Sequence, residues 1–91
     1  MDSILQNKKY CLICGTEIKL HKHHVYAGNP NRKKSEENGC WCWLCQYHHT
    51  GDGGVHQDPD LDRALKQRCQ NKFEATHSRE EFIKIFGKSW L

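Results

Sequence analysis

Residues 39–56 read GCWCWLCQYHHTGDGGVH, and they join a strand pattern to a turn rich in metal ligands. Small or aliphatic residues alternate with Trp41 and Trp43, and this period of two predicts a strand over residues 39–44. We expect the two indoles to share one face of the strand and to cover the core. Three glycines among residues 51–54 then indicate a loop rather than a helix.

The cysteines supply candidate ligand pairs for a structural zinc ion. Tetrahedral zinc sites commonly draw two ligands from each of two tight turns, with two residues between the ligands of a pair. Cys11 and Cys14 have this spacing, and so do Cys45 and His48. Cys42 with Cys45 is an alternative second pair, but we favour Cys45 with His48 because the predicted strand ends before the turn. The cysteines left over are expected to be small buried hydrophobic residues: Cys40, Cys42 and Cys69.

Length and composition favour a single metal-stabilised domain. The chain has 91 residues, 36% of them hydrophobic, and a mean hydropathy of −0.91. A domain this small with so thin a core usually needs a disulfide or a metal ion. We find no signal-peptide pattern and no apolar run near the roughly 20 residues of a spanning helix, so we expect a cytoplasmic protein without membrane contact. In a reducing compartment the six cysteines are better explained as metal ligands than as disulfides.

The rest of the chain predicts a small α+β fold. A strand is expected over residues 18–26, followed by an exposed loop over residues 27–34. Asp58 as N-cap and Pro59 at the first helical position predict a helix that ends near Thr76. Its buried stripe should consist of residues four apart: Leu61, Leu65, Cys69 and Phe73.

A last helix is predicted near the C-terminal end of the sequence. Ser78 and Glu81 form a capping box, and Gly87 stops the helix. The residues that it should bury are Phe82, Ile83 and Phe86.

Two groups of histidines form a second candidate site: His23, His24, His49 and His56. With the ligand pairs and strands, this ordered set over about residues 11–60 resembles the HNH, or ββα-metal finger, endonucleases. It is most similar to HNH proteins of phage genomes and to the phage recombination-enhancement nucleases. The resemblance implies a zinc-stabilised ββα-metal finger with additional C-terminal helices over about residues 58–90. It also implies the cytoplasm of a bacterial host if the protein is phage-encoded.

The resemblance implies a role for each residue of this second site. His23 would bind a divalent cation, and His24 would be the general base. His49 and His56 would complete the protein ligands of the cation. Asn38 is the best counterpart of the asparagine that helps to orient the base in the family. An all-imidazole ligand set favours Mn²⁺, Ni²⁺ or Co²⁺, with Mg²⁺ less favoured.

Strand geometry leaves a second assignment of the histidines open. Successive strand residues point to opposite faces, so His23 and His24 can share one site only if the strand ends or bulges there. Otherwise His21 and His23 would be the ligands, and His24 would be structural.

Charge and site chemistry together predict a partner with phosphates. The net charge is +3, and Arg32, Lys33 and Lys34 are candidate contacts to DNA phosphates or else simply solvated loop residues. We expect a metal-dependent DNA endonuclease that hydrolyses phosphodiester bonds. The alternatives are a non-catalytic zinc module that binds nucleic acid and a zinc domain that binds protein. A protein partner or a homodimer remains open.

Overall fold

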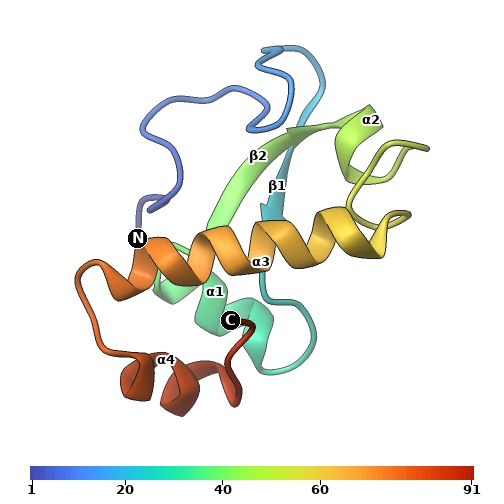
Figure 1. Ribbon diagram of the computed structural model, residues 1–91. Coiled ribbons are helices and arrows are strands. Elements are labelled where there is room, and N and C mark those ends of the chain that lie inside the picture. The colour runs from blue at the N-terminus through green and yellow to red at the C-terminus, as the bar shows by residue number, and fades with distance from the viewer.

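The computed structural model describes residues 1–91 and consists of a two-stranded antiparallel sheet with helices around it (Figure 1). The elements follow in the order β1 (Leu20–His24), α1 (Asn31–Glu37), β2 (Trp41–Cys45), α2 (Gln46–His49), α3 (Pro59–Glu74) and α4 (Arg79–Phe86). In the view of Figure 1 the long helix α3 runs across the two strands, α2 is drawn above the first turns of α3, and α1 and α4 lie below α3. The predicted fold class, a small α+β fold, is confirmed.

The end of strand β1 bears on the two assignments of the histidines that the sequence leaves open. β1 is shorter than predicted and ends at His24, after which the chain bends towards α1. In the register of the sheet, His23 lies opposite Cys42 and His24 lies opposite Trp41. Because the strand ends here, two successive histidines can approach one site in spite of the alternation of strand side chains.

The core side of β2 carries its small side chains, so the prediction that the indoles cover the core is wrong. Cys42 and Leu44 are fully buried. They belong to one hydrophobic cluster that also contains Cys69 of α3. These thiols act as small hydrophobic side chains of the core.

The two indoles occupy the opposite side of β2, where they are half-buried. The ring nitrogen of Trp41 donates a hydrogen bond to the carbonyl of Met1 at 3.0 Å. The ammonium groups of Lys22 and Lys9 lie 4.1 and 4.4 Å from the ring centres of Trp41 and Trp43. An indole has both an apolar body and a polar N–H, so a rim position suits it.

Helix α1 replaces the second half of the loop predicted over residues 27–34. It begins at Asn31 and buries only Ser35. The hydroxyl of Ser35 donates to the carbonyl of Tyr26 at 2.8 Å and accepts from the Tyr26 amide at 3.2 Å. Because α1 is held in place by a buried serine and not by apolar side chains, its sequence lacks the periodic apolar residues that would predict a helix.

The C-terminal helices begin at the residues predicted from their caps. Asp58 caps α3 by accepting from the amides of Asp60 and Leu61, and Ser78 caps α4 by accepting from the amide of Glu81. On α4, Ile83 is 40% exposed, so the prediction that it is buried is wrong. Its place against the core is taken by the partly buried Ile85. None of the helices is both long and apolar enough to cross a bilayer.

Candidate metal centres

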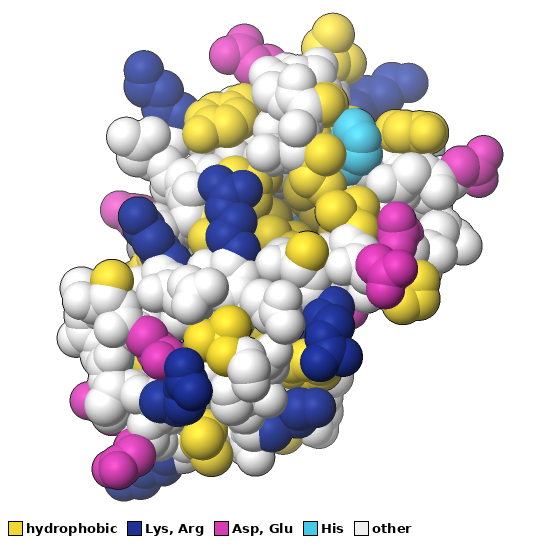
Figure 2. Space-filling model, in the orientation of Figure 1, with side chains coloured by type: hydrophobic (Ala, Val, Ile, Leu, Met, Phe, Trp, Pro, Cys, Tyr) yellow, Lys and Arg dark blue, Asp and Glu magenta, His cyan; other side chains and the backbone are white.

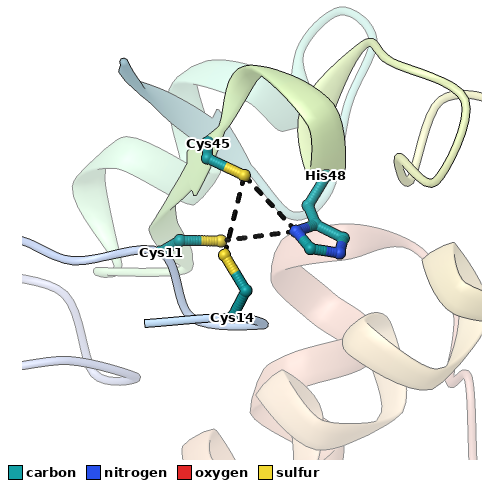
Figure 3. A group of neighbouring side chains, drawn as sticks. All are labelled: Cys11, Cys14, Cys45 and His48. Carbon is teal, nitrogen blue, oxygen red and sulfur yellow. Dashed lines mark hydrogen bonds between the residues drawn. The ribbon is translucent and has the colours of Figure 1, made fainter. Parts of the chain in front are cut away.

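The first candidate centre brings together the four predicted zinc ligands: Cys11, Cys14, Cys45 and His48. Their ligand atoms all lie within 4.8 Å of one another, and Figure 3 shows the four side chains converging from two segments of the chain. The Sγ atoms of Cys14 and Cys45 are 3.8 Å apart, and Nδ1 of His48 lies 3.3 Å from Sγ of Cys45. Ligands about 2.0 to 2.3 Å from a tetrahedral zinc ion lie about 3.3 to 3.8 Å apart, so the spacing fits such an ion.

Local hydrogen bonds hold the first ligand pair against the sheet. The amide of Gly15 donates to the carbonyl of Cys11 at 2.8 Å and closes the turn. Gly15 has a φ of +82°, which favours glycine at this position. The amide of Leu12 donates to the carbonyl of Trp43 at 2.9 Å and so fastens the turn to β2. One helical turn of α2 brings His48 back over Cys45 at the end of the same strand.

The Cys11 thiol of this centre ionises more readily than an ordinary thiol. Burial raises the pKa of Cys11, but hydrogen bonds from the backbone at Cys45, Cys14 and Ile13 outweigh it and lower the pKa to about 6. Several thiolates at such short distances repel one another unless a cation lies between them. The four residues could therefore hold a metal ion such as zinc, with every tetrahedral position filled by protein.

The alternative ligand Cys42 lies outside this group. Its side chain is fully buried in the core, and burial raises its pKa to about 12. A buried neutral thiol is a packing residue rather than a ligand. Cys40 and Cys69 are also fully buried, as the sequence predicts.

The second candidate centre consists of three histidines from three different segments: His23 on β1, His49 at the end of α2, and His56 in the loop before α3. One ring nitrogen of each lies within 4.8 Å of the others, and the Nε2 atoms of His49 and His56 are 3.1 Å apart. Two nitrogens about 2.1 Å from one cation lie about 3.0 to 3.4 Å apart. The geometry fits three protein ligands, with further coordination positions left to other groups.

The ring of His23 in this second group is buried and leaves one nitrogen unsatisfied. It is only 4% exposed, and its Nε2 atom is buried without a hydrogen-bond partner. Burial, with the neighbouring His49 and His56, lowers its pKa to about 4. Burial also lowers the pKa of His49, with contributions from His56 and His21. A neutral ring with an unsatisfied nitrogen is the form that binds a cation.

A glycine-rich loop folds back to bring His56 beside His49. The amide of His56 donates to the carbonyl of His49 at 3.3 Å, and the amide of Gly54 donates to the carbonyl of Gly51 at 2.9 Å. A Cβ atom on Gly54 would lie 2.5 Å from the carbonyl oxygen of His49. Only glycine fits this close approach, so the loop can return to the centre without a helix.

The predicted base, His24, lies at the mouth of the same centre. A pocket of about 320 Å³ is lined by His24 together with His23, His49, His56 and Arg32. A larger groove of about 640 Å³ shares His24 and Arg32 with this pocket and extends over Lys33. His24 thus stands between the three-histidine centre and a groove with two basic side chains.

Glu36 of α1 is a site residue that the sequence does not reveal. Its Oε1 atom lies 3.7 Å from Nε2 of His24 and 3.0 Å from Nζ of Lys22. The hydrogen bond from Lys22 is the main cause that holds the pKa of Glu36 below its ordinary value. The carboxylate is therefore ionised beside His24. Since α1 lacks a sequence pattern, its contact with β1 could not be foreseen.

Asn38, predicted to orient the base, has a different contact. It ends α1, and its side-chain amide donates to the carbonyl of Lys34 at 2.8 Å. The backbone amide of Asn38 donates to the same carbonyl at 3.0 Å, so both groups of this residue close the last turn of α1. The polar side chain directed at His24 is that of Glu36 instead.

The three basic residues of the predicted DNA contact differ in their surroundings. Arg32 and Lys33 line the groove beside His24. Lys34 donates to the carbonyl of Ile85 at 2.8 Å and thereby joins α1 to α4. On the face shown in Figure 2, basic and acidic side chains are interspersed, which is typical of a solvated surface.

In comparisons with known proteins, no family model, no curated protein and no solved structure matches this chain.

Proposed function

We propose that this protein is a metal-dependent DNA endonuclease of the HNH, or ββα-metal finger, type. The observation that carries the proposal is the convergence of His23, His49 and His56, with a fourth histidine, His24, in the same pocket. A zinc module that only binds nucleic acid needs the four ligands of the first centre but has no use for this second group.

The second centre suits phosphodiester hydrolysis. A divalent cation held by the three histidines would supply positive charge to a phosphate oxygen and to the leaving oxygen. The nitrogen ligands favour Mn²⁺, Co²⁺ or Ni²⁺, and three protein ligands leave room for substrate. Cys11, Cys14, Cys45 and His48 would hold a separate zinc ion that stabilises the fold.

His24 is proposed as the general base. A neutral imidazole can accept the proton of an attacking water. Its side chain is 15% exposed, so solvent reaches it, and the carboxylate of Glu36 lies 3.7 Å from its Nε2 atom. The negative charge would stabilise the imidazolium that forms.

The groove beside His24 is the proposed path of the DNA backbone. Arg32 and Lys33 offer positive charge there, and Arg32 also borders the three-histidine pocket. A guanidinium group pairs with phosphate through two parallel hydrogen bonds. Lys34, which is engaged with α4, is left out of this contact set.

Nicking of supercoiled plasmid, measured with each added metal, tests this function. We expect cleavage with Mn²⁺, Co²⁺ or Ni²⁺ and weaker cleavage with Mg²⁺. His24→Ala should lower the nicking rate by roughly 10²- to 10⁴-fold, because a positioned base contributes about that much. Its zinc content and melting temperature should stay unchanged.

The exposed His77, which stacks on Phe73 between the last two helices, provides the matched control. His77→Ala should nick plasmid as the unchanged protein does. Full activity of His24→Ala would show that another group is the base. DNA binding without nicking in every metal would favour the non-catalytic zinc module instead.

A further inference from the structure

His21 is a histidine that neither candidate centre uses as a ligand. It lies on β1 two residues before His23, so the two side chains share one face of the strand. Its Nδ1 atom is 3.1 Å from Nδ1 of His49, and the two ring centres are 5.2 Å apart at 74°. The contact is between exposed side chains and joins β1 to α2.

Both nitrogens of the His49 ring are engaged, each with a different histidine. Nδ1 meets His21, whereas Nε2 lies 3.1 Å from Nε2 of His56 on the side of the three-histidine centre. The two nitrogens of an imidazole point away from each other, so His21 cannot be a further ligand of an ion bound at Nε2. His21 instead contacts Nδ1 of His49, the ring nitrogen that faces away from the three-histidine centre.

The positions of the ring protons decide which of the two histidines donates this hydrogen bond. A neutral imidazole carries one proton, and a ring that gives its Nε2 lone pair to a cation must carry that proton on Nδ1. Nδ1–H of His49 then donates to Nδ1 of His21, which carries its own proton on Nε2. Outer partners of this kind fix the tautomer and the orientation of histidine ligands.

We propose that His21 is a positioning residue that holds His49 in its cation-binding tautomer and so strengthens cation binding at the three-histidine centre. The inference rests on the proposed function only in taking this centre to bind a cation. It assigns His21 no contact with the cation or with DNA.

Calorimetric titration of the zinc-loaded protein with Ni²⁺ tests the inference. His21→Ala should weaken Ni²⁺ binding by about 10- to 100-fold, the usual loss for an outer partner of a ligand. His21→Asn places a carbonyl oxygen close to the position of Nδ1, so it should recover most of that affinity. His77→Ala is the matched control and should bind Ni²⁺ as the unchanged protein does.

Plasmid nicking by the same variants separates positioning from a role in the reaction. If His21 acts through cation affinity, His21→Ala should be slow at limiting metal and should return close to the unchanged rate at saturating metal. Equal Ni²⁺ affinity for His21→Ala and the unchanged protein would overturn the inference, and so would an Asn variant no better than the Ala variant. A protein that binds Ni²⁺ with the expected dependence on His21 but cuts no DNA would refute the proposed function and leave this inference standing.

Discussion

At the scale of the residue, the burial of the His23 ring would favour the cation binding proposed for it. Its Nε2 atom has no hydrogen-bond partner, and an unsatisfied buried nitrogen costs free energy that a bound cation would recover. The sequence predicts His23 as a ligand by its place in the order of histidines. It does not show that the ring is buried, because burial depends on how the loop before α3 folds back over β1.

The lowered pKa of His23 leads to a prediction about its protonation. Burial and the neighbouring histidines lower this pKa to about 4, so the ring should remain neutral at pH 5.5. An unperturbed imidazole, with a pKa of about 6.5, would be about nine-tenths protonated at that pH. Because the folded value lies below the unfolded one, this group contributes stability above about pH 6.5 and loses it as the pH falls towards 4.

Nitrogen-resolved NMR of the histidine side chains, in zinc-loaded protein without a second cation, measures this protonation directly. A His23 ring that is already protonated at pH 5.5 would contradict the burial that the structure shows.

At the scale of the element, three separate segments must fold in register to complete the second centre. β1 ends where two successive histidines are needed, and α2 makes a single turn that directs His48 to one centre and His49 to the other. The loop at residues 50–58 then returns His56 beside His49.

Gly54→Ala tests the fold of this loop. The added methyl group would lie 2.5 Å from the carbonyl oxygen of His49, so the loop must shift and carry His56 away. We expect Ni²⁺ affinity at the three-histidine centre to fall by about tenfold or more, while the zinc content stays unchanged. The exposed Asp52 of the same loop offers a matched control, and Asp52→Ala should bind Ni²⁺ normally. Unchanged nickel binding by Gly54→Ala would contradict this role of the loop.

The elements differ in how well their sequences predict them. Asp58 and Ser78 are capping residues with a local mechanism, so the starts of α3 and α4 could be predicted. α1 could not, because only Ser35 of its seven residues is buried and it shows no apolar period. The indoles of β2 were assigned to the wrong side, since alternation alone does not tell which of two apolar faces meets the helix.

At the scale of the whole molecule, the four residues of the first centre come from the N-terminal segment and from the end of β2 with α2, which hydrogen bonds such as that from the Leu12 amide to the Trp43 carbonyl also join. A zinc ion at this centre would link Cys11 and Cys14 to the end of β2 and to α2, and Cys11 is itself one of the 13 buried hydrophobic residues of the core. The spacing of the cysteines and His48 predicts the first group, and the resemblance to HNH endonucleases implies the second. Glu36 beside His24 and His21 beside His49 were not, because these contacts depend on how separate elements pack together.

Because two metal centres are proposed, counting the ions bound per chain is the most direct test of that proposal. Native mass spectrometry of the zinc-loaded protein, titrated with Ni²⁺, should show one zinc ion and one further ion per chain. His49→Ala should keep its zinc and take up no further ion, since its loss leaves two of the three ligands. Cys14→Ser removes an exposed ligand without disturbing the core, and it should lose zinc together with the folded state.

In the same titration, Ile13→Ser changes an exposed residue of the turn and should keep both ions. We predict two ions for the unchanged protein and one for His49→Ala. A single ion in the unchanged protein, or equal nickel uptake by His49→Ala, would contradict a second metal centre at the three histidines.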